Sequence, residues 1–112
     1  RAGGALTARL QVSGSTSAFA DLSGASPEQA ARFALGAVLR DWRIDRYRTR
    51  LSDKQKPTLD RVAIAGAAEG AEGAWDRLRA VAEGVAFTRE LVSEPGNVIY
   101  PESFVERCQR LT

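Results

Sequence analysis

A long helical pattern, from about Glu69 or Glu72 to Leu91, constrains the fold of this chain more than any other feature. A helix of about 20 residues spans roughly 30 Å, which is long enough to connect two structural units. Its apolar face is broad and consists of Trp75, Leu78, Val81, Ala82, Val85, Thr88, Leu91 and Val92. Such a broad face is usually covered on more than one side. This favours a helix between two domains, or at a subunit contact, over a core helix of a single domain.

A turn and a new helix start follow this pattern directly. In Glu94-Pro95-Gly96-Asn97 the proline cannot continue a helix, and glycine and asparagine tolerate positive φ. Pro101 suits the first turn of a last helix, whose apolar residues are Phe104, Val105, Cys108 and Leu111. That pattern reaches Thr112 without a stop signal, and the first residue is not methionine. We therefore expect a segment of a longer protein.

The first part of the chain contains two further helical patterns. Ser26-Pro27-Glu28-Gln29 predicts a capped helix start, and the helix continues to about Asp41. Its small residues, Ala34, Gly36 and Ala37, would let a neighbouring backbone come close. Residues 2–10 have the alanine and leucine content of a helix end.

Two short strands are predicted around the capped helix, at residues 18–22 and 61–66. Between the helix and the second strand, we expect residues 42–49 to be extended or irregular and residues 52–60 to form an exposed loop. The predicted fold class is α/β: a partial N-terminal α/β domain with few strands, a long connecting helix, and the first helix of a truncated second α/β domain. The corresponding ranges are 1–70, 71–94 and 95–112.

The composition excludes several kinds of site. The chain has no histidine and one cysteine, Cys108, so Ser-His-Asp and Cys-His nucleophile pairs and a self-contained zinc site are excluded. We expect Cys108 to be a buried thiol in its apolar stripe. There is no apolar run of about 20 residues for a membrane span, and no secretory signal, so we expect no membrane partner.

The acidic residues of the long helix do not predict a catalytic or metal site. They are Glu69, Glu72, Asp76, Glu83, Glu90 and Glu94. Most should face solvent, where Asp76 and Glu83 can pair with Arg79 at helical spacing. No third ligand or base is spaced to converge with them. We therefore assign no catalytic and no metal-binding residue in this chain.

Five arginines crowd into one stretch: Arg40, Arg43, Arg46, Arg48 and Arg50. With Trp42 and Tyr47 interleaved, they could bind phosphates and stack on bases. The alternative is a solvated or interfacial edge, because Asp41 and Asp45 partly neutralise the run. We favour a solvated or interfacial edge and consider a nucleic-acid partner the weaker alternative, since a single patch of mixed sign is weak evidence for phosphate binding.

Two stretches resemble the leucyl aminopeptidase (cytosol aminopeptidase) family. The first, Ala34 to Thr49, is similar to a helix-to-strand signature of the family's N-terminal domain. The second, Ala80 to Pro101, is similar to the linker helix and the entry into the catalytic domain. The second is more specific, because it ends in R-x-L-V-x-E-P-x-N-x-x-Y-P. It departs from the family in Ser93, where Asn is usual, and in Gly96.

The resemblance implies a cytoplasmic, hexameric exopeptidase that removes N-terminal residues from peptides, often leucine, with two divalent metal ions, zinc or manganese. The family's metal-binding and catalytic motifs match no residue here, so this segment would be inactive by itself and would bind no metal. Its implied role is scaffold and assembly, with the remainder of the peptidase chain and further subunits as partners. A stand-alone interaction or nucleic-acid-binding module on the Arg40–Arg50 cluster is the competing hypothesis.

Overall fold

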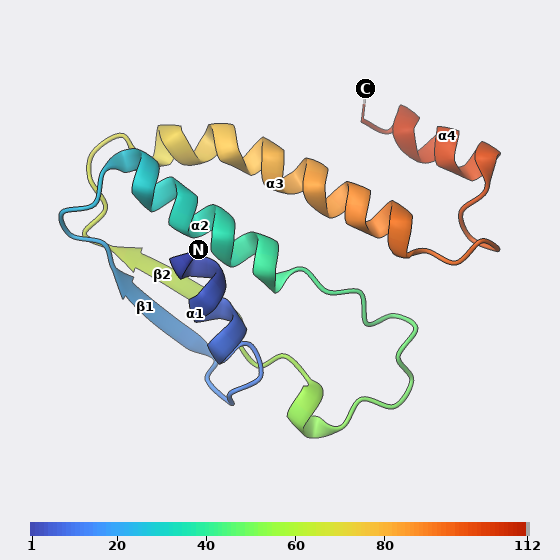
Figure 1. Ribbon diagram of the computed structural model, residues 1–112, viewed down its shortest axis with the longest axis horizontal. Coiled ribbons are helices and arrows are strands. Elements are labelled where there is room, and N and C mark those ends of the chain that lie inside the picture. The colour runs from blue at the N-terminus through green and yellow to red at the C-terminus, as the bar shows by residue number, and fades with distance from the viewer. Residues whose placement is uncertain (112) are drawn as a thin grey trace.

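The computed structural model describes residues 1–111, which form four α-helices and a two-stranded sheet. The elements follow in the order α1 (Ala2–Leu10), β1 (Ser17–Asp21), α2 (Pro27–Asp41), a 3₁₀ turn (Asp53–Gln55), β2 (Arg61–Ala65), α3 (Ala71–Ser93) and α4 (Pro101–Gln109). Helices α1 and α2 lie over one face of the sheet, and α3 runs beside α2 (Figure 1). The predicted α/β class, a partial domain with few strands, is confirmed.

The molecule is a thin slab rather than a sphere. It measures 49 × 38 × 17 Å and has a radius of gyration of 16.5 Å. A compact domain of this length has a radius of gyration of about 13 Å. The difference arises because the irregular segment of residues 42–60, called the 42–60 segment below, and α4 extend beyond the packed helices and strands (Figure 1).

The sheet is covered on one face only by the described residues. β1 and β2 are parallel, with Ser17 opposite Arg61 and Asp21 opposite Ala65, and α2 makes the crossover between them. Ala20 is buried under the helices. The preceding residue, Phe19, points to the other face of the sheet and is 80% exposed. Parallel sheets are normally covered on both faces. This exposed phenylalanine therefore marks a surface that further protein could cover.

Helices α1 and α2 cross at their glycines. A Cβ on Gly36 would lie 3.1 Å from the backbone nitrogen of Gly4, and a Cβ on Gly3 would overlap the carbonyl of Phe33. The predicted close approach at Gly36 is confirmed, and the neighbouring backbone is that of α1. α2 begins where expected, because Ser26 and Gln29 form a reciprocal capping box.

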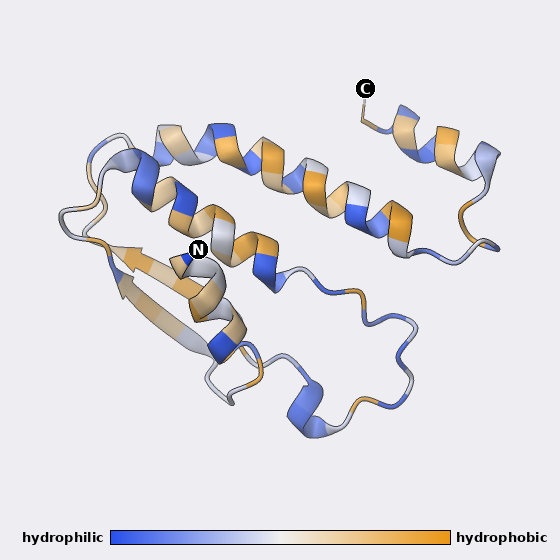
Figure 2. Cartoon of the chain, viewed as in Figure 1, coloured by the Kyte–Doolittle hydropathy of each residue, from blue (hydrophilic) through white to orange (hydrophobic). Residues whose placement is uncertain are grey.

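The interior is thin because small side chains fill it. In residues 1–111 the buried apolar side chains are all alanines: Ala20, Ala30, Ala31, Ala37, Ala74 and Ala82. Both strands are apolar along most of their length, and apolar bands recur on α2 and α3 (Figure 2). Alanine lets these elements approach closely, but each alanine removes little apolar surface from water.

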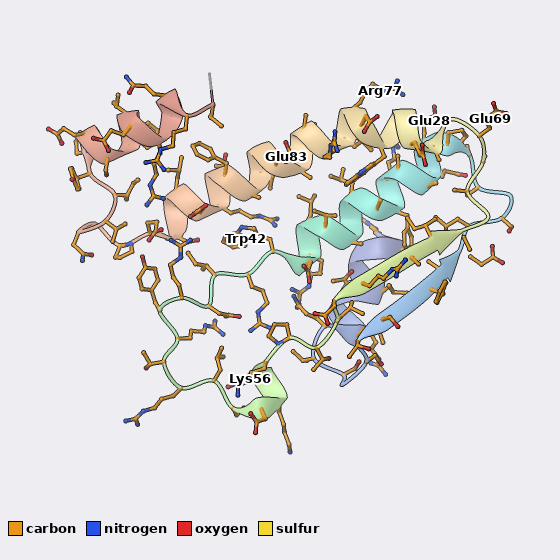
Figure 3. The ribbon with its side chains drawn as sticks, turned by 180° about the vertical axis from the view of Figure 1, so that it is seen from behind. Glu28, Trp42, Lys56, Glu69, Arg77 and Glu83 are labelled. Carbon is orange, nitrogen blue, oxygen red and sulfur yellow. The ribbon has the colours of Figure 1, made fainter. Side chains whose placement is uncertain are left out.

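Helix α3 extends the predicted range by two residues at its end and packs lengthwise against α2. Arg89 of α3 donates a hydrogen bond from Nη1 to the carbonyl oxygen of Leu39 at 2.6 Å. Its guanidinium also lies over the ring of Trp42, at 5.8 Å from the ring centroid. Trp42 accordingly lies between the end of α2 and α3 (Figure 3). The division into 1–70, 71–94 and 95–112 remains a prediction, and Thr112 lies outside the described residues.

Helix α4 is the least covered helix. None of its residues is buried, so the prediction of a buried thiol at Cys108 is wrong: this side chain is half-buried. Phe104 and Val105 of the predicted apolar face are exposed. Among the described helices, none combines the length and apolarity needed to cross a membrane.

Candidate functional site

The structure separates the five clustered arginines into paired and unpaired groups. Arg43 donates from Nη2 to the carbonyl oxygen of Gln55 at 3.1 Å, and its Nε lies 2.8 Å from Asp45 Oδ2. Arg48 Nε lies 3.8 Å from Asp45 Oδ1. Within residues 1–111 the guanidinium groups of Arg40 and Arg50 have no ion pair or hydrogen bond.

Arg46 leaves the cluster and reaches the end of α3. Its Nη1 donates to Glu94 Oε1 at 2.6 Å, and its Nη2 donates to Glu90 Oε1 at 2.7 Å. Glu90 and Glu94 are one helical turn apart, so their carboxylates stand side by side and accept both ends of the guanidinium. This pair fixes the first part of the 42–60 segment to the end of α3.

Glu94 is the centre of this arrangement. Its side chain has no exposed surface, and its Oε2 accepts a hydrogen bond from the hydroxyl of Tyr47. Its partners Arg46 and Tyr47 are themselves about half exposed. The Glu94 carboxylate therefore lies close to the molecular surface, beneath side chains that reach solvent.

These contacts shift the proton affinities of the partners. The hydrogen bond from Tyr47, followed by the charges of Arg46 and Arg107, lowers the pKa of Glu94. The same hydrogen bond raises the pKa of Tyr47, because ionising the phenol would remove the donated proton. The hydrogen bond to Glu90 raises the pKa of Arg46. All three shifts favour the protonation states that these side chains have at neutral pH, namely an ionised Glu94, a neutral Tyr47 and a charged Arg46.

A second arginine approaches the same carboxylates from α4. Arg107 Nη2 lies 3.5 Å from Glu94 Oε1, and its Nη1 lies 3.9 Å from Glu90 Oε1. We call Arg46, Tyr47, Glu90, Glu94 and Arg107 the Glu94 cluster. It joins three parts of the chain: the 42–60 segment, the end of α3, and α4.

The sequence prediction for the acids of α3 is correct in part. Asp76 and Glu83 pair with Arg79 at 3.5 and 4.0 Å on an exposed face, as expected. Glu94 differs, because it is covered and shares long-range partners. Helical periodicity could not identify this role, because Glu94 is the residue that ends the helix. The only signal was its place directly before Pro95, where the backbone turns.

The Glu94 cluster does not fit a metal ion. Two carboxylates face two guanidinium groups, which satisfy the oxygens that a cation would need. Residues 1–111 contain no group of three or more histidine, cysteine, aspartate or glutamate side chains that could hold a metal ion. The chemistry available at this site is ion pairing that orders the chain.

The aromatic residues of the arginine stretch are also engaged. Trp42 has Arg89 over its ring, and the hydroxyl of Tyr47 is bound to Glu94. A nucleic-acid platform of the kind considered above needs ring faces and cations that are free to bind bases and phosphates. In this structure Trp42 and Tyr47 instead contact other parts of the same chain.

Sequence comparison relates the chain to bacterial proteins named "Probable cytosol aminopeptidase". It is 44% identical over 89 residues to the protein of Caulobacter vibrioides, covering 79% of this chain and 18% of that protein. It is 40% identical over 113 residues to the protein of Afipia carboxidovorans, covering 97% and 23%. For Rhizobium johnstonii the identity is 38% over 116 residues, covering 99% and 23%.

The chain thus spans about a fifth of the length of the curated relatives that it matches. It matches no profile of an established protein family. No solved structure matches it significantly.

Proposed function

We propose, starting from the homology of this chain to a segment of the cytosol aminopeptidases, that it is part of a leucyl aminopeptidase that removes N-terminal residues from peptides. The observation that carries this proposal is the 38–44% identity to three relatives named "Probable cytosol aminopeptidase", which extends over 79–99% of the chain. The matches that cover 97% and 99% of the chain include the R-x-L-V-x-E-P-x-N-x-x-Y-P stretch. It covers the end of α3, the turn and the start of α4.

The role that we propose for the segment itself is structural. Peptide hydrolysis by a two-metal site requires several carboxylates arranged to hold the ions. The carboxylates that come together here, Glu90 and Glu94, are already bound by arginines. We therefore place the two divalent ions of the proposed enzyme, zinc or manganese, on other parts of the protein, and we derive no catalytic step from the residues of this segment.

The segment would act by positioning neighbouring parts of the enzyme. The Glu94 cluster fixes the direction in which the chain leaves α3 and enters α4. The uncovered apolar residues Phe19 and Val92, which are 80% and 78% exposed, offer surface to the remainder of the peptidase chain or to further subunits. We further propose that the enzyme is a cytoplasmic homohexamer that acts on peptides.

The proposal is tested by measuring hydrolysis of leucine p-nitroanilide in the presence of Mn²⁺ or Zn²⁺. Two proteins are compared: a chain of residues 1–112 alone, and the same segment joined to the remainder of an aminopeptidase relative in place of the matching region. We expect turnover only from the joined protein. Turnover by the isolated segment would contradict the scaffold role. A folded joined protein without turnover would contradict the assignment of the segment to such an enzyme.

A further inference from the structure

Two guanidinium groups bind the same two oxygen atoms in the Glu94 cluster. Arg46 contacts Glu94 Oε1 with Nη1 and Glu90 Oε1 with Nη2. Arg107 contacts these same atoms with Nη2 and Nη1. One arginine comes from the 42–60 segment and the other from α4, so one pair of oxygens connects both to α3.

The two arginines do not share these oxygens equally. Arg46 is bound at 2.6 and 2.7 Å, the short distances of strong charge-assisted hydrogen bonds. Arg107 is held at 3.5 and 3.9 Å, near the limit of an ion pair. Two like charges that approach the same oxygens also repel each other. The strong contact of Arg46 therefore weakens the contact of Arg107.

The other contacts of both partners are weak enough for this competition to matter. α4 contains no buried residue, and between its side chains and the end of α3 there is an open groove of about 550 Å³, lined by Phe87, Leu91, Val98 and Leu111 among others. The 42–60 segment has no regular structure except the 3₁₀ turn. Arg46 and Tyr47 supply the hydrogen bonds from this segment to Glu90 and Glu94 at the end of α3.

We propose that Arg46 and Arg107 compete for the Glu90–Glu94 pair, so that seating of the 42–60 segment loosens α4 from α3, and release of this segment tightens it. The Glu94 carboxylate then accepts a strong hydrogen bond from one of the two arginines at a time. When Arg46 is withdrawn, Arg107 moves onto the freed oxygens and draws α4 across the groove. An anionic group that captures Arg46 would change the position of α4 without touching it.

The experiment uses Arg46→Gln in the protein that carries this chain, with hydrogen exchange measured by mass spectrometry. We expect the amides of residues 101–109 to exchange more slowly, by roughly tenfold. This is the size of effect that is typical when two residues share one salt-bridge network and one of them is replaced. A structure of the variant should show the distance from Arg107 Nη2 to Glu94 Oε1 shortened from 3.5 Å towards about 2.8 Å. Faster or unchanged exchange in α4 would overturn the proposal.

Matched variants separate competition from a loss of folding. Arg79→Gln removes one positive charge from α3 outside the cluster and should leave exchange in α4 unchanged. Arg107→Gln should conversely slow exchange in residues 42–50. If amide exchange in Arg46→Gln also becomes faster in α1 and α2, the variant has lost stability as a whole, and the measurement is repeated with Arg46→Lys. Lysine keeps the charge but cannot bridge both carboxylates in the same way. This variant should tighten α4 to a smaller degree, and no tightening would contradict the competition.

Discussion

The guanidinium of Arg46 and the carboxylate of Glu94 lie 2.6 Å apart, although 48 residues separate them in the chain. Between them the chain completes the 42–60 segment, forms β2 and runs the full length of α3. Closing such a long loop costs conformational entropy, which a contact must offset. The fit of a planar guanidinium to two carboxylates, together with the Tyr47 hydroxyl, supplies that contact.

Replacement of Tyr47 by Phe should make the stability of the protein less dependent on pH. The Tyr47 hydrogen bond lowers the folded-state pKa of Glu94, so its contribution is present above the unfolded pKa of ~4.3 and is lost as the pH falls through the folded pKa. It also raises the folded pKa of Tyr47, so that contribution is present below the unfolded pKa of ~10 and is lost as the pH rises through the folded pKa.

The measurement is the difference in urea midpoint between wild type and Tyr47→Phe across this range. We expect a constant difference from about pH 5 to 9, which shrinks on both sides. Tyr100→Phe, at the other tyrosine of the chain, is the control. An equal difference for Tyr47→Phe at pH 3 and pH 7 would show that the hydrogen bond does not set the pKa of Glu94.

Gly3→Ala should destabilise the protein at the crossing of α1 and α2. The added Cβ overlaps the carbonyl of Phe33, so α1 must shift. Such overpacking costs about 1–3 kcal/mol of unfolding free energy. Gly84→Ala is the matched control, because a Cβ there meets nothing within 4 Å. It should stabilise α3 by roughly 0.5–1 kcal/mol. Urea unfolding followed by circular dichroism measures both, and a shift of the same sign for the two variants would contradict this account.

The helices and strands could be predicted because their signals are local. Ser26 and Gln29 indicate the start of α2. Pro95 indicates the end of α3, and Pro101 the start of α4. The small residue Gly36 also predicts that a neighbouring backbone comes close. The identity of that neighbour, α1, depends on the path of the whole chain, which local patterns do not contain.

The Glu94 cluster could not be predicted for a related reason. The sequence places Arg46 among neighbouring arginines and Glu94 among the acids of the long helical pattern, and neither pattern indicates that the two side chains meet. Their pairing depends on how the 42–60 segment folds back onto α3, and this segment has almost no regular structure. The burial of Cys108 was wrongly predicted, because an apolar stripe shows which face of α4 could be covered but not whether the described chain covers it.

Arg89→Met should weaken the contact between α2 and α3. The variant keeps an unbranched side chain but loses the hydrogen bond to the Leu39 carbonyl and the cation over Trp42. We expect a loss of about 1–3 kcal/mol in unfolding free energy. Arg77→Met is the control, because Arg77 is exposed and projects away from α2 (Figure 3).

Tryptophan fluorescence in a Trp75→Phe background reports on Trp42 alone, since the chain has two tryptophans. The emission of Trp42 should change with Arg89→Met and stay constant with Arg77→Met. An unchanged urea midpoint and emission for Arg89→Met would mean that the contact does not hold the two helices together in solution.

A salt titration of DNA binding tests the hypothesis of a nucleic-acid module on the arginine stretch. Each phosphate contact adds about 0.9 to the magnitude of the log–log slope of affinity against salt. If all five arginines bound phosphates, the slope for duplex DNA would be roughly −4.5, whereas two free arginines allow about −2 at most. Because Arg43, Arg46 and Arg48 are paired within the chain, we expect either no measurable binding or the shallow slope.

Fluorescence anisotropy of a labelled duplex measures this slope, and the Arg40→Gln/Arg50→Gln variant is the matched control. Any weak binding should disappear in this variant, because it removes the two arginines of this stretch that have no ion pair or hydrogen bond within residues 1–111. A slope near −4.5 that survives in the control would mean that the paired arginines dissociate from Asp45 and from the carboxylates of the Glu94 cluster and bind phosphate instead. The ion pairs of the free protein would then be a resting state of a nucleic-acid interface, and the role of these arginines as internal contacts would be wrong.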